Sequence, residues 1–205
     1  MRSHPLAFLA LLSLLAAAPA SQPAGTVTVA GQVTAASGTL PAEMVVFLQP
    51  ADPSLKFPPP ATPATISQKG AKFAPSLLVI CAGQTVEFKN DEDRPIEHNV
   101  FSRSPVQPFD LGLWRPPTDK TVTFSNPGVV RLYCSIHRLM DGMIYVCPTP
   151  FWAKVGTDGK YRIENVPPGQ WRLCTWQRQA KFDERDVPLK TDSADANVDL
   201  DMSRK

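Results

Sequence analysis

Histidine is scarce in this chain, and its scarcity limits the chemistry that the protein can carry. The 205 residues include three histidines, at positions 4, 98 and 137, and four cysteines. An enzyme with two metal centres, one of them rich in histidine, needs more than three imidazole ligands. We therefore do not expect an enzyme of that class. Neither sign of charge is in large excess, because the chain has 21 basic and 19 acidic residues. Binding to nucleic acid, which usually needs a distinct basic surface, is therefore not indicated.

Long apolar runs are lacking as well. A helix that spans a bilayer takes about 20 apolar residues, and no stretch of the sequence reaches that length. The apolar stretch 6–15 follows a weakly basic start and precedes the small residues Ala18-Pro19-Ala20. This order is typical of a secretory signal peptide, here residues 1–20, cleaved after Ala20. We therefore expect a soluble exported protein, located in the periplasm.

No long segment shows the 3.6-residue period of a helix, and the pattern predicts an all-β chain. Short runs rich in Val, Thr and Phe alternate with turns that contain Gly, Pro and Asp, as in β-sandwiches and barrels. The first of these runs lie within residues 26–50. Residues 50–63 then contain six prolines. Because proline does not fit central strands, we predict a proline-rich linker over residues 51–63.

Three potential metal ligands follow one another at three-residue intervals late in the chain. Cys134, His137 and Met140 offer a thiolate, an imidazole and a thioether, and His98 is the remaining histidine outside the predicted signal peptide. A thiolate and two imidazoles with a weak axial thioether describe a blue-copper electron-transfer centre. This ligand set suits zinc less well, since a structural zinc site has four strong ligands. The alternative for so short a motif is a buried cysteine and a solvated histidine near a core methionine.

The region around His98 connects these donors to a known family. Residues 82–90, Ala-Gly-Gln-Thr-Val-Glu-Phe-Lys-Asn, precede His98-Asn99-Val100, and a Tyr133-Cys134 loop follows later. Over roughly residues 64–147 this order resembles the cupredoxins, and the ligand-loop spacing is similar to that of the amicyanin type. The resemblance implies a cupredoxin Greek-key β-sandwich over residues 64–149.

The resemblance also implies one copper ion per chain. The implied ligands are His98, Cys134, His137 and Met140. Met143, three residues further on, is the other candidate axial donor, but the family pattern Met-x-Gly fits Met140 and leaves core packing as the role of Met143. A copper-free descendant of the family remains the alternative.

The cupredoxin resemblance assigns roles around the ligands too. Asn99 matches a family asparagine whose side chain ties the first ligand loop to the residue after the cysteine, here Ser135. His137 matches the partly exposed ligand through which electrons pass, and Ile136 and Leu139 could supply an apolar docking patch beside it. The alternatives are that Asn99 is an ordinary turn asparagine and that Ile136 and Leu139 are core side chains.

Cys81 and Cys147 end two apolar runs whose counterparts lie in one sandwich in cupredoxins. Because export permits disulfides, the resemblance suggests a Cys81–Cys147 bridge. Two free thiols are the alternative, since sequence does not fix connectivity. Cys174 then has no partner, and we expect a buried, inert thiol there.

Past residue 149 the pattern changes. Thr157-Asp158-Gly159 has the composition of a hairpin turn, and Val166-Pro167-Pro168-Gly169-Gln170-Trp171 follows. This order resembles the carboxypeptidase regulatory-like (transthyretin-like) β-sandwich, whose opening strands resemble runs within residues 26–50. We therefore predict that residues 26–50 and 150–203 form one sandwich with the cupredoxin segment inserted between them. The alternative is that residues 26–49 extend the cupredoxin itself.

The function predicted from these residues is electron transfer rather than catalysis. We expect a periplasmic type 1 copper protein that carries single electrons between redox partners such as a c-type cytochrome or a dehydrogenase. We do not expect a hydrolase, because Cys134 and His137 are three residues apart in a tight loop, which rarely orients a base toward a nucleophile. The alternatives are a non-redox binding or structural module, for a partner or a carbohydrate, and a copper storage or delivery protein.

Overall fold

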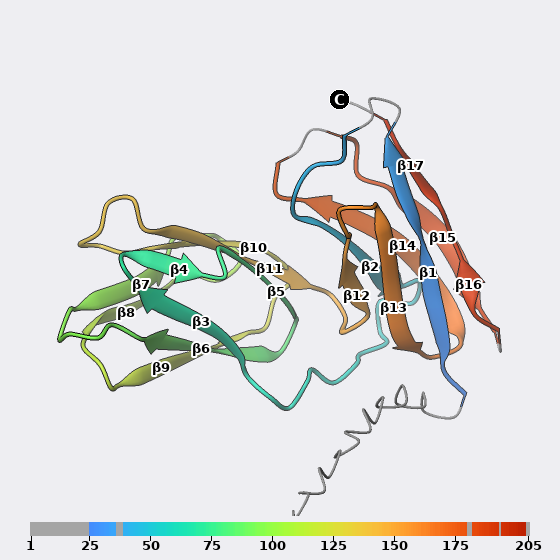
Figure 1. Cartoon of the computed structure of the whole chain (residues 1–205). Helices are drawn as coiled ribbons and strands as arrows, with labels where there is room; N and C mark the ends of the chain where they lie inside the picture. The colour runs from blue at the N-terminus through green and yellow to red at the C-terminus, as the bar shows by residue number, and fades with distance from the viewer. Residues whose placement is uncertain (1–24, 36–38, 180–181, 193, 204–205) are drawn as a thin grey trace, which may run out of the picture.

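The described part of the chain is built from β-strands. The computed structural model describes residues 25–35, 39–179, 182–192 and 194–203 (Figure 1). Within these ranges it has strands β1 to β17 and no helix, so no helix there could cross a membrane. The all-β prediction is confirmed. The predicted signal peptide, residues 1–20, lies outside the described ranges.

Residues 64–147 form a two-sheet sandwich, called here the central sandwich, on the left in Figure 1. One sheet has the strand order β5-β11-β10-β7-β8 and the other β4-β3-β6-β9. Inward-facing apolar side chains such as Phe88 and Phe124 fill the space between them, as expected for alternating strands. The strands are β3 (Ala64–Lys69), β4 (Lys72–Ala74), β5 (Leu77–Cys81), β6 (Gln84–Asn90), β7 (His98–Ser102), β8 (Phe109–Trp114), β9 (Asp119–Phe124), β10 (Gly128–Tyr133) and β11 (Asp141–Cys147).

The first and last strands of the chain form a second unit, called here the terminal sandwich. Its sheets have the orders β13-β1-β16, with β17 also paired to β1, and β12-β2-β14-β15. Blue and orange-red strands therefore lie side by side on the right in Figure 1. The strands are β1 (Val27–Ala35), β2 (Met44–Pro50), β12 (Trp152–Lys154), β13 (Lys160–Val166), β14 (Gly169–Gln177), β15 (Asp186–Thr191), β16 (Ala196–Asn197) and β17 (Leu200–Met202).

The last segment of the chain docks along β1. β16 and β17 both pair with β1 in parallel. The carboxylates of Asp195 and Asp199 accept hydrogen bonds from the backbone N–H groups of Thr28 and Gln32, at 2.7 and 2.8 Å. A Cβ atom on Gly31 would lie 1.9 Å from the Val198 carbonyl oxygen. Only glycine therefore allows this close approach.

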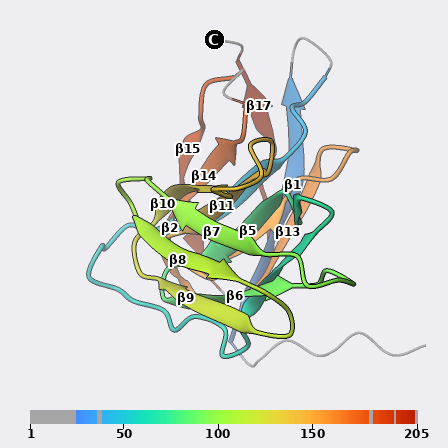
Figure 2. The same cartoon turned by 90° about the vertical axis from the view of Figure 1, so that its left-hand side faces the viewer.

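β11 is buried on both faces and joins the two sandwiches. Ile144 and Val146 point into the core of the central sandwich, whereas Tyr145 points the other way. The ring of Tyr145 stacks on that of Trp176, with centroids 4.1 Å apart and planes 7° apart. Figure 2 views this arrangement with the central sandwich in front of the terminal one. The buried residues between the sandwiches, called here the interface cluster, are Val45, Phe47, Leu77, Val79, Met143, Tyr145, Cys147, Cys174 and Trp176.

The proline-rich residues 51–63 contain no strand. One side chain nevertheless fixes this segment to the terminal sandwich. Phe57 packs against Phe151 and Trp171, with ring centroids 5.0 and 5.3 Å away. This connection between the sandwiches is therefore held by aromatic contacts and, at its start, by a backbone hydrogen bond from Ala51 N–H to the Gln170 carbonyl at 3.0 Å.

The predicted Cys81–Cys147 disulfide is absent from the structure, and this corrects the sequence prediction. The two residues are direct partners in the parallel pairing of β5 with β11, but both thiols are free and buried. Burial raises the pKa of both thiols, and disulfide formation needs a thiolate. Cys174, as predicted, is a free buried thiol.

Replacing Trp176 by alanine is expected to cost about 3–5 kcal/mol of unfolding free energy, because the change removes a large buried ring and its stack on Tyr145. Urea unfolding followed by circular dichroism measures this cost. Leu55→Ala is the control, since Leu55 is 51% exposed, and its effect should stay within about 0.5 kcal/mol. Equal unfolding free energies for the two variants would contradict an interface cluster that stabilises the molecule.

Thiol labelling tests the cysteine assignment. In the native, non-reduced protein, Cys81, Cys147 and Cys174 should resist a thiol reagent, because all are buried and burial raises each pKa, that of Cys174 to about 12. After denaturation, all four cysteines should react. A pre-reduced sample is the control. A shortfall of two thiols, with Cys81 and Cys147 peptides joined in non-reducing mass spectrometry, would restore the disulfide.

Candidate metal centre

Two separate segments of the central sandwich carry the four predicted ligands. His98 is the first residue of β7. Cys134 follows the end of β10, and His137 and Met140 lie in the loop that leads to β11. This ligand loop, residues 134–140, projects from the end of the central sandwich that faces away from the terminal one (Figure 1).

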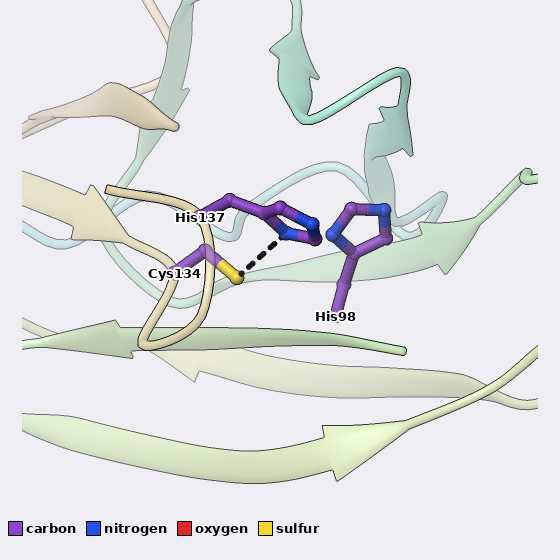
Figure 3. A group of neighbouring side chains, drawn as sticks. All are labelled: His98, Cys134 and His137. Atoms are coloured by element: carbon purple, nitrogen blue, oxygen red, sulfur yellow. Dashed lines mark hydrogen bonds between the residues drawn. The ribbon is translucent and has the colours of Figure 1, made fainter. Parts of the chain in front are cut away.

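Three of the predicted ligands converge. The candidate donor atoms of His98, Cys134 and His137 all lie within 4.8 Å of one another. The Cys134 Sγ atom is 3.6 Å from Nδ1 of His137, and the two imidazole centroids are 4.7 Å apart (Figure 3). His98 is fully buried, Cys134 is buried, and His137 is half-buried. Only the imidazole of His137 is therefore partly open to solvent among these three.

The hydrogen bonds of His98 leave one ring nitrogen free. Nε2 lies 2.9 Å from Oε1 of Glu92. A carboxylate only accepts hydrogen bonds, so Nε2 carries the proton that is donated. Nδ1 is buried and has no hydrogen-bond partner. A buried nitrogen with an unused lone pair is what a metal ligand needs before the metal arrives.

Glu92 is held as an acceptor for His98. The hydrogen bond from His98 lowers the pKa of the Glu92 carboxyl group, and backbone hydrogen bonds from Gly70 and Ala71 act in the same direction. The side chain of Glu92 is 10% exposed. Glu92 is therefore an ionised carboxylate directly behind the first histidine.

Asn99 connects the two ligand segments. Its backbone N–H donates to Sγ of Cys134 at 3.5 Å, and its side-chain oxygen accepts from the backbone N–H of Ser135 at 3.2 Å. Its Nδ2 atom donates to Oδ1 of Asp110 at 2.7 Å, which fixes the orientation of the amide. The link from Asn99 to Ser135 that the cupredoxin resemblance implies is thus present in the structure.

Met140 closes the ligand loop. Its backbone N–H donates to the His137 carbonyl at 2.9 Å, and its own carbonyl accepts from Cys134 N–H at 3.3 Å. Its side chain is buried in the same core cluster as Cys134. Met143, the other methionine considered, belongs to the interface cluster on the opposite side of β11. The structure therefore gives Met143 a packing role.

The donor set suits copper. A single thiolate, two imidazoles and a buried thioether match the soft, mixed ligands of copper sites. A structural zinc site needs a fourth strong ligand, and the group that the described residues bring together contains three such side chains. The unpartnered Nδ1 of His98 supports a bound metal of either kind, because a metal ion would satisfy it.

The residues flanking His137 are exposed. Leu139 is 93% exposed and Ile136 49%. They are surface residues, so the alternative that they belong to the core is wrong. Tyr133 and Leu113 are also exposed apolar side chains in the central sandwich.

Glu92 and Asp110 are the site residues that the sequence prediction missed. Glu92 lies six residues before His98, in a loop that also contains Asp91 and Asp93. No short motif distinguishes these three carboxylates, because the fold of the loop decides which one reaches the histidine. The one available signal was that a metal-bound histidine usually donates its second N–H to a carboxylate or carbonyl.

No family model matches the chain, and no curated protein matches it. Among solved structures, a purple cupredoxin from Nitrosopumilus maritimus is 26% identical, with a TM-score of 0.37, over 40% of this chain and 98% of that one. A copper-containing nitrite reductase from Thermus scotoductus SA-01 is 30% identical, with a TM-score of 0.40, over 48% of this chain and 25% of that one.

An oxidised amicyanin with a methionine-to-leucine substitution is 19% identical, with a TM-score of 0.37, over 40% of this chain and 80% of that one. The similar structures thus include cupredoxins, each matching less than half of this chain. Because the TM-scores are below 0.5, the case for a metal centre stands on the side-chain geometry. No match supports the carboxypeptidase regulatory-like resemblance of the terminal sandwich, which stays a prediction.

Asn99→Ala should weaken copper binding by about 10- to 100-fold, because the ligand loop loses its connection to β7. Unfolding free energy should also fall by about 0.5–1.5 kcal/mol, since the buried Asn99 side chain loses its hydrogen bonds to Ser135 and Asp110. Copper affinity by competition with a chromophoric chelator measures the first effect. Asn126→Ala is the control, because the exposed Asn126 makes a surface hydrogen bond to Val106. Equal affinities in both variants would contradict a role for Asn99 at the site.

Proposed function

We propose that this chain is a type 1 copper protein that carries single electrons between redox partners. The observation that carries the proposal is the convergence of His98, Cys134 and His137 around the buried, unpartnered Nδ1 atom of His98. These three residues and Met140 would hold one copper ion. When bound, copper would supply a one-electron change between its two oxidation states.

Electron transfer is favoured by how the protein holds these ligands. Asn99, Glu92 and the loop-closing hydrogen bonds of Met140 fix the donors before any metal is present. A preorganised site changes little between two oxidation states, and this lowers the barrier to outer-sphere transfer. His98, Cys134 and Met140 are buried. His137 is therefore the ligand best placed to face a partner.

The surface beside His137 suits a transient partner. Ile136 and Leu139 are exposed next to it, and redox encounters bury small areas. We propose a c-type cytochrome or a dehydrogenase as the partner and the periplasm as the location. The location rests on the predicted signal peptide, residues 1–20. The proposal is non-enzymatic, because the histidines suffice for a single mononuclear centre.

Cys134→Ser tests the proposal directly. Wild-type chain from residue 21, loaded with Cu(II), should show an intense visible thiolate-to-copper charge-transfer band and bind one copper. The band should vanish in Cys134→Ser, because serine removes the thiolate. Cys174→Ser is the matched control, since Cys174 is a buried thiol in the terminal sandwich, and it should keep the band.

Reversible one-electron voltammetry of the blue form should follow. A colourless wild-type protein without stoichiometric copper would rule out the type 1 centre and favour the binding module. A blue protein without reversible redox chemistry would instead favour storage or delivery of copper.

A further inference from the structure

The turn between β3 and β4 contacts the metal centre through Glu92. Gly70 and Ala71 form this turn with positive φ angles of 60° and 55°. The backbone N–H of Gly70 donates to Oε1 of Glu92 at 2.6 Å, and the N–H of Ala71 also bonds to this carboxylate. The same Oε1 atom lies 2.9 Å from Nε2 of His98. A continuous path of hydrogen bonds therefore runs from the turn to the first histidine.

The loop that carries Glu92 is fixed at its start. Asn90 is buried, and its Nδ2 atom donates to the carbonyls of Ile96 and Trp114, both at 3.0 Å. Its side-chain oxygen accepts from the backbone N–H of Glu92 at 3.4 Å. Asn90 thus closes the loop and sets the direction from which Glu92 reaches His98.

Glu92 differs from its neighbours in the same loop. The side chain of Asp93 is 82% exposed and pairs with Lys69 at the surface. The side chain of Glu92 is 10% exposed and meets an imidazole that is fully buried. A negative charge that is shielded from water acts more strongly on its surroundings than an exposed one.

We propose that Glu92 is a positioning residue for the copper ligand His98, held in place by the Gly70–Ala71 turn. As acceptor for Nε2–H, it selects the tautomer of the neutral imidazole in which the Nδ1 lone pair is free for the metal. As a shielded negative charge, it stabilises Cu(II) more than Cu(I) and so lowers the reduction potential. This role rests on the proposed function. The Glu92 carboxylate would thus set the tautomer of His98 and also lower the reduction potential of the copper centre.

Two substitutions separate the two effects. Glu92→Gln removes the charge but keeps an acceptor, because the N–H of Gly70 orients the amide oxygen where Oε1 now lies. Glu92→Ala removes both charge and acceptor. Asp93→Asn is the matched control, since it removes one charge from an exposed carboxylate of the same loop.

The reduction potential of the copper form should rise in Glu92→Gln. If the substitution weakens Cu(II) binding tenfold more than Cu(I) binding, the reduction potential rises by about 59 mV for this one-electron couple. Cu(II) affinity should fall by about 10- to 100-fold in Glu92→Ala. Asp93→Asn should keep the wild-type potential and affinity.

The tautomer is read in the copper-free full chain by nitrogen-15 NMR of the imidazoles. His98 should carry its proton on Nε2 in wild type and in Glu92→Gln, and should lose this preference in Glu92→Ala. A wild-type potential in Glu92→Gln, or a wild-type tautomer in Glu92→Ala, would overturn the proposal. If wild type takes up no copper, the type 1 function fails, while the copper-free NMR measurement still decides whether Glu92 positions His98. Thermal unfolding of each variant identifies any general loss of structure.

Discussion

The burial of β11 on both faces is the constraint on which the rest of the structure depends. The strand begins directly after Met140 and ends in the interface cluster. Its side chains alternate between two apolar cores, so its position cannot shift without opening one of them. The ligand loop is therefore attached to a strand that both sandwiches hold. Tyr145, stacked on Trp176, is the point at which the terminal sandwich contributes to that hold.

Around the ligands, rigidity comes from polar contacts between segments that are distant in sequence. Glu92 reaches His98 from the loop after β6, and Asp110 orients Asn99 from β8. Asn99 in turn bonds to the backbone of Ser135 and to the sulfur of Cys134. His98 and Asn99 are buried, so their polar groups would be costly to leave without partners. The site thus satisfies its own polar groups, with Nδ1 of His98 as the exception that suits a metal.

Much of this could be predicted from the sequence, because local chemistry encodes it. The spacing of Cys134, His137 and Met140 places three donors in one loop, and the scarcity of histidine left His98 as the natural fourth. Alternating apolar residues likewise predicted the strands. Glu92 could not be predicted, since loop geometry selects it from several carboxylates. The Cys81–Cys147 prediction was right about adjacency, since the two residues are partners in the pairing of β5 with β11, but both thiols are free in the structure.

The pairing of β1 with residues 196–202 has a consequence for folding during synthesis. Every strand of the central sandwich is available once residue 147 has been synthesised, whereas β1 pairs with β16 and β17 at residues 196–202. Contacts that close such a long loop form late, because the chain entropy must be paid first. The edge of β1 that pairs with β16 and β17 therefore stays unpaired while the central sandwich folds. An unpaired strand edge is prone to aggregation, so a chain truncated before residue 196 should depend on chaperones even though its ligand residues are all present.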